Sequence, residues 1–62
     1  MTVKKINSAI RHTGLEIVRG QGYQYFLDTT GNQIGEAVMV CYLNQLSLRG
    51  WVLEAEEARK ES

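Results

Sequence analysis

The chain has 62 residues, a formal net charge of zero, 44% apolar residues and 23% charged residues. These values are those of one ordinary globular domain, residues 1–62, rather than a disordered tail. They also argue against a membrane span, because the longest apolar run, residues 37–43, is far below the ~20 residues that cross a bilayer.

Cysteine usage and the N-terminus indicate a cytoplasmic protein. Cys41 is the only cysteine, so one chain can form neither an internal disulfide nor a thiol-based metal cage. No apolar stretch of a secretion signal follows Met1. We expect no cofactor and no metal. At this length the stability is roughly 3 to 9 kcal/mol, so a partner can matter as much as the core.

The first predicted element is a short amphipathic helix over residues 3–12. Its apolar residues recur at helical spacing and fall on one stripe. Thr2 is suited to cap its N-terminus, and Gly14 stands where a left-handed residue would end it. The stripe consists of Val3, Ile6, Ala9 and Ile10.

Three strands are predicted next, over residues 15–19, 23–28 and 36–43. The first two are joined by Gly20-Gln21-Gly22, whose glycines permit the positive φ angles of a tight hairpin. The third follows the connection formed by residues 28–35. Antiparallel pairing of consecutive strands is the simplest topology, because a parallel pair would need a crossover for which there are no residues.

The last predicted element is a helix over residues 48–60 with Ser47 as its N-cap. The apolar stripe comprises Leu48, Trp51, Val52, Ala55 and Ala58. Leu53 projects away from that stripe, so it is either exposed or in contact with another molecule. The fold class is therefore α+β, in the order helix, three-stranded antiparallel meander, helix.

The predicted sheet is apolar on both faces. Residue parity puts Tyr23, Tyr25 and Leu27 on one face of strand two, and Gln24 and Phe26 on the other. Two short helices either cover one face and leave an apolar patch, or lie on opposite faces and cover both. The first arrangement predicts a homodimer or another protein partner. The predicted interface side chains are Phe26, Val38, Val40, Tyr42 and Leu53.

No set of catalytic residues can be assembled from the sequence, so we expect a protein that is not an enzyme and has no small-molecule substrate. His12, on a polar helix flank, is expected to be a solvated surface residue. Cys41 is either a nucleophile activated by a base or, as its apolar strand favours, an inert packed side chain. Asp28 is expected to bond the backbone of the turn that it opens.

A nucleic-acid-binding module is the alternative function. Aromatic side chains on an open sheet can stack on unpaired bases while nearby cations hold phosphates. Zero net charge argues against this alternative. The residues that would carry it are Lys4, Lys5, Arg11, Arg19, Tyr23 and Tyr25.

Three segments, residues 13–26, 38–43 and 46–52, resemble short uncharacterised proteins of bacteria, phages and prophages. The resemblance implies a bacterial or phage setting, in which small accessory proteins commonly bind a macromolecule of the host or the phage. That family has no assigned activity, so the resemblance implies no site residue.

Overall fold

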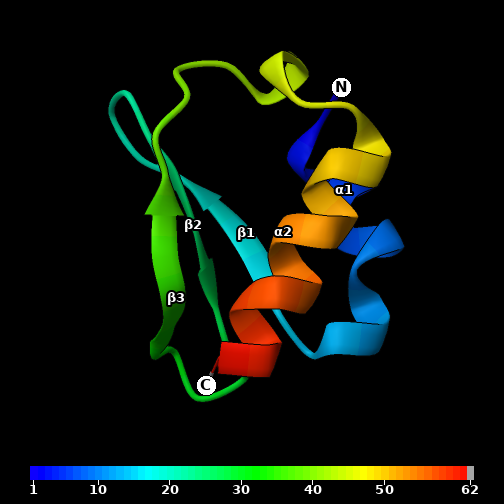
Figure 1. Ribbon diagram of the computed structural model, residues 1–62, viewed down its shortest axis with the longest axis vertical. Coiled ribbons are helices and arrows are strands. Elements are labelled where there is room, and N and C mark those ends of the chain that lie inside the picture. The colour runs from blue at the N-terminus through cyan, green and yellow to red at the C-terminus, as the bar shows by residue number, and fades with distance from the viewer. Residues whose placement is uncertain (62) are drawn as a thin grey trace.

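The computed structural model of the protein describes residues 1–61 and has the predicted order of helix, three strands and helix. The sheet forms one layer and the two α-helices form the other (Figure 1). The elements in chain order are α1 (Val3–Ala9), the 3-10 turn η1 (Arg11–Thr13), β1 (Glu16–Arg19), β2 (Gln24–Leu27), β3 (Gln33–Val38), the 3-10 turn η2 (Leu43–Gln45) and α2 (Leu48–Glu61).

The N-terminal helix begins as predicted and is shorter than predicted. The Thr2 hydroxyl accepts a hydrogen bond from the Lys5 amide at 3.1 Å, which caps the first turn. α1 ends at Ala9, and the chain tightens into η1. Gly14, with φ of 74°, ends η1 rather than the α-helix. A change to 3-10 geometry is common where an α-helix ends, and it moves the boundary without moving the buried stripe.

The strands form one antiparallel sheet in the order β1-β2-β3, which confirms the predicted meander. Gly22, with φ of 80°, supplies the left-handed residue of the first hairpin. At the second turn one Asp28 carboxylate oxygen accepts hydrogen bonds from the Thr30 hydroxyl, the Thr30 amide and the Asn32 amide. Both turns therefore have the local chemistry that the sequence predicted.

The third strand was placed wrongly by the sequence: β3 spans Gln33–Val38 rather than residues 36–43. Gly35, expected in the preceding connection, lies within the strand at φ of 74°, where the register of β3 against β2 shifts. A Cβ atom at Gly35 would lie 2.7 Å from the Cβ of Ala58 on α2. This glycine thus permits both the irregular register and the close approach of α2 to β3.

A buried polar side chain holds the segment that follows β3. Gln24 is fully buried, and its Nε2 donates to the carbonyl oxygens of Val40 at 2.9 Å and Cys41 at 3.3 Å. These carbonyls therefore bond a side chain instead of a neighbouring strand. Cys41 is exposed, so the expectation of a packed cysteine inside a strand was wrong.

One apolar core joins both helices to the same face of the sheet. The rings of Phe26 on β2 and Trp51 on α2 pack edge to face, with their centroids 6.4 Å apart. The Trp51 indole N–H donates a hydrogen bond to the Leu43 carbonyl oxygen at 2.6 Å. The alternative with helices on opposite faces is excluded. The core comprises Ile6, Ile10, Leu15, Ile17, Phe26, Leu43, Trp51, Ala55 and Ala58.

Candidate functional site

The face of the sheet turned away from the helices is the candidate site. Alternation along β1 and β2 sends Ile17 and Phe26 into the core and their neighbours to the opposite side. Val18 pairs with Tyr25 in the centre of the β1–β2 ladder, and Glu16 pairs with Leu27 at its end. We call Val18, Tyr23, Tyr25 and Leu27, with Glu16 at the margin, the outer face.

Two tyrosines form the aromatic part of the outer face. The ring centroids of Tyr23 and Tyr25 are 5.8 Å apart, and the two ring planes are inclined at 30° to each other. Tyr23 is 37% exposed, and its ring lies against Gly20, where an added Cβ would be 2.5 Å from ring atoms. Gly20 therefore permits this ring to lie across the hairpin next to Tyr25. Gly20 was predicted only as a turn residue, and no sequence pattern indicated its contact with the Tyr23 ring.

The predicted interface residues do not form one surface, and the assignment needs correction. Phe26 is 1% exposed and belongs to the core, because the helices cover the side of β2 that carries it. Val38 and Val40 are half-buried and pack against the same core. Tyr42 and Leu53 are 65% and 52% exposed, on the N-cap of η2 and on α2. None of the five lies on the outer face.

The cations of the nucleic-acid hypothesis do not come from the positions of β1 and β2 that form the outer face. Lys4 and Arg11 line a hollow between α1 and the start of β1, which they share with the carboxylate of Glu16. Lys5 is exposed on α1. Arg19 follows Ile17 by two residues, so alternation puts its side chain on the helix-facing side of the sheet. Lys4 and Arg11 therefore border the outer face only at its Glu16 margin, and alternation puts no cation of the strands beside the two tyrosines.

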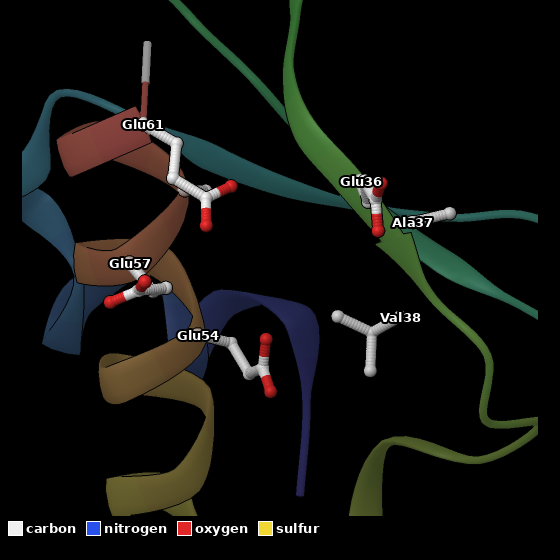
Figure 2. Close-up of a pocket in the computed structure, with 7 residues that line it drawn as sticks. Glu36, Ala37, Val38, Glu54, Glu57 and Glu61 are labelled. Carbon is white, nitrogen blue, oxygen red and sulfur yellow. The ribbon is translucent and has the colours of Figure 1, made fainter.

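A second hollow lies between β3 and α2 and has a volume of about 240 Å³. Figure 2 shows the Glu54 and Glu61 side chains on α2 reaching towards the strand across this hollow, while Ala37 points away from the helix. Glu57 on α2 also lines the hollow. Glu36 adds a fourth carboxylate from β3. Nevertheless, residues 1–61 contain no group of three acidic, histidine or cysteine side chains able to hold a metal ion.

His12 joins η1 to α2. Its Nε2 lies 2.7 Å from Oε2 of Glu56, and both side chains are about half exposed, at 54% and 47%. The neighbouring Thr13 hydroxyl is buried and donates to the Ile10 carbonyl at 2.6 Å. Cys41, the other candidate for chemistry, lies on the connection after β3, at the opposite end of the molecule from η1 (Figure 1). The two candidates are therefore not brought together.

Asp28 is a structural turn residue. Its pKa lies below the ordinary value of 3.8, first because the Thr30 hydroxyl donates to the carboxylate and then because the Asn32 amide does. Within residues 1–61, the side-chain oxygen of Asp28 accepts hydrogen bonds from Thr30 and Asn32, which belong to the turn itself. We therefore assign Asp28 a structural role, which is to hold the turn that sets the register of β3.

Two further observations bear on the class of protein. None of the helices within residues 1–61 is long and apolar enough to cross a membrane. Comparison with protein-family models, curated proteins and solved structures found no match to this chain.

Proposed function

We propose that the protein is a small, non-catalytic interaction module that binds another protein surface through the outer face. The observation that carries this proposal is that both helices cover one face of the sheet and leave Val18, Tyr23, Tyr25 and Leu27 on the other. Tyrosine is enriched at protein interfaces, because its ring supplies apolar area while its hydroxyl stays hydrated. The bacterial or phage setting implied by the resemblance is part of the proposal.

Charge favours a protein partner over nucleic acid. A single-strand binder needs cations along the track of the backbone beside its stacking rings. Among the strand residues, alternation puts one charged side chain on the outer face, the anionic Glu16. The four cations lie on α1, on η1 and on the helix-facing side of the sheet. An apolar, uncharged protein surface matches this face better than a phosphate backbone does.

The proposal of a non-catalytic role is supported by where the reactive side chains lie. A nucleophile and its base must come within hydrogen-bond reach, about 2.6 to 3.2 Å. The His12 imidazole contacts Glu56, and the adjacent Thr13 hydroxyl is already committed to the Ile10 carbonyl. This arrangement links η1 to α2 and presents no activated hydroxyl beside the imidazole.

Site-specific photo-crosslinking tests the proposal. A photoreactive phenylalanine analogue replaces Tyr25 on the outer face or, in the matched control, Glu57 on α2, and both variants are irradiated in bacterial cells. We expect nuclease-resistant protein adducts from position 25 and not from position 57. Adducts that disappear on nuclease treatment would support the nucleic-acid alternative. Equal adducts at both positions, or none at 25, would contradict the outer face as the binding site.

A direct measurement addresses the alternative function. Binding of a labelled single-stranded DNA oligonucleotide is followed by fluorescence anisotropy at low and at physiological salt. We expect no saturable binding, because the outer face lacks the cations whose counterion release drives association. Saturable binding that weakens with salt and is lost in Tyr25→Ala would favour nucleic acid.

A further inference from the structure

Large exposed apolar side chains gather at one end of the molecule. Within residues 1–61 five such side chains are exposed, namely Met1, Tyr23, Met39, Tyr42 and Leu53. All but Leu53 lie at the end formed by the β1–β2 hairpin, the segment between β3 and α2, and the N-terminus, at the top of Figure 1. Met39 and Tyr42 are the most exposed of the five. We call Met39, Tyr42 and the exposed Cys41 between them the apolar tip.

The backbone of the apolar tip is bonded inward. The buried Gln24 amide donates to the carbonyl oxygens of Val40 and Cys41, and the Tyr42 amide donates to Oε1 of Gln45. Backbone groups that have partners inside the protein leave water at a far smaller cost than unpaired ones. The tip can therefore enter an apolar medium without exposing these carbonyl and amide groups to it.

Two arginines border this end, and the stretches that form it carry no charge. Residues 20–23 and residues 37–48 contain no charged side chain. Arg19 directly precedes the first stretch at the end of β1, and Arg49 directly follows the second in the first turn of α2. Both are exposed, and neither forms an ion pair with a carboxylate within residues 1–61. Both cations are therefore free to meet an anionic partner.

The carboxylates lie farther along the molecule. Glu36 and Glu54 line the hollow between β3 and α2, and Asp28 lies in the turn at the opposite end (Figure 1). We infer that the apolar tip docks on the surface of an anionic lipid bilayer. The tip enters the headgroup region, where tyrosine rings are favoured, while Arg19 and Arg49 contact lipid phosphates from the rim. This contact goes beyond the proposed function and does not depend on the outer face.

The size and chemistry of the tip favour lipid over a macromolecular partner. A stable protein complex buries about 800 Å² per partner in a surface of matched shape, and a loop with three exposed side chains supplies much less. A lipid surface requires no matched shape and accepts apolar side chains to a depth of about 5 to 10 Å. Met39 also has no ring to stack on a nucleic-acid base. Lipid is therefore the occupant that fits an apolar tip with a cationic rim.

Vesicle flotation tests the inference. Vesicles of phosphatidylglycerol and phosphatidylcholine in equal parts are compared with phosphatidylcholine alone. We expect the unmodified chain to bind the anionic vesicles, more weakly as salt screens the arginines, and to bind the neutral vesicles least. The double variant Met39→Ser, Tyr42→Ser should lower the partition coefficient by about tenfold or more, because two large apolar side chains are lost. Arg49→Gln should lower it by about fivefold, the effect of one cation near an anionic surface.

Matched variants and a fluorophore locate the contact. Leu53→Ser removes an exposed apolar side chain from α2, and Arg11→Gln removes a cation from η1, so both should bind like the unmodified chain. A polarity-sensitive fluorophore on Cys41, the only cysteine, should shift its emission to the blue on anionic vesicles. The same fluorophore on Glu57→Cys, in a chain with Cys41→Ser, should not shift.

Each contrary outcome overturns the inference. Absence of binding to anionic vesicles, or equal binding to neutral ones, does so and leaves the proposed function to the crosslinking at Tyr25. A loss in Leu53→Ser as large as that in the double variant places the contact elsewhere, as does a blue shift at position 57 alone. Salt-sensitive binding of the labelled oligonucleotide without binding to vesicles would assign the arginines to nucleic acid. Trp51 fluorescence checks folding, and where the double variant is unfolded, Met39→Ser alone decides.

Discussion

Phe26 and Tyr25 are neighbours on one strand and have opposite surroundings. Phe26 is 1% exposed under Trp51, whereas Tyr25 is half-buried and contacts Tyr23. The helix-facing side carries a closed core, and the outer face carries comparable apolar groups with no cover from either helix. The comparison shows that apolar content alone does not locate a core: the element that covers a face determines which of its side chains stabilise the monomer.

Replacing each of these two aromatic residues with alanine tests the comparison most directly. Phe26→Ala removes a buried ring and should lower the free energy of unfolding by about 3 to 5 kcal/mol. Tyr25→Ala should lower it by about 1 kcal/mol, chiefly through loss of the aromatic contact. Urea unfolding followed by Trp51 fluorescence measures both. If Phe26→Ala leaves too little structure, Phe26→Leu should still fold, with a smaller loss than Phe26→Ala because it leaves a smaller cavity. Equal losses at positions 25 and 26 would contradict a one-sided core.

Much of the helical structure was predictable because helical periodicity is local. The stripes that bury Ile6, Ile10, Trp51 and Ala55 were predicted from their spacing, as was the Ser47 cap, whose hydroxyl accepts from the Gly50 amide at 3.0 Å. The alternation of side chains along a strand also divided the second strand correctly into its two faces. Parity cannot say which set of side chains the helices cover, and the polar Gln24 beside Phe26 made the true inner face look less apolar.

The third strand could not be placed from the sequence because its end depends on a contact across the chain. Residues 37–43 are continuously apolar, which predicts a buried strand. In the structure Gln24, sixteen residues before Val40, takes the carbonyls that would have continued the ladder. Met39 is consequently 76% exposed. Three of the predicted interface residues, Val38, Val40 and Tyr42, followed this misplaced strand, which is why they do not coincide with the outer face.

Gly35 and Gly20 test the comparison of the two faces further. Gly35 is closely approached by Ala58 of α2 on the helix-facing side, and Gly20 by the Tyr23 ring on the outer face. Gly35→Ala should destabilise by about 2 to 4 kcal/mol, since alanine is strained at φ of 74° and its Cβ would meet Ala58 at 2.7 Å. Gly20→Ala meets one edge of the Tyr23 ring, which can swing outward because the side chain is partly exposed, so the loss should be about 1 kcal/mol. Chemical denaturation ranks the two variants. The reverse order would place the tight packing on the outer face.

The smallest expected effect concerns the turn that sets the register of β3. A one-residue slip would exchange the two faces of that strand, and the Asp28 carboxylate holds the turn through the Thr30 hydroxyl and the Asn32 amide. These donors keep its pKa below 3.8, so the associated stability is present above about pH 4 and is lost as the pH falls through the folded-state pKa. An NMR titration of Asp28, the sole aspartate, should give a midpoint below 3.8. Thr30→Ala removes the largest cause of the shift and should raise that midpoint. An unchanged midpoint in this variant would mean that the hydroxyl does not hold the turn, and the register would then depend on the strand pairing alone.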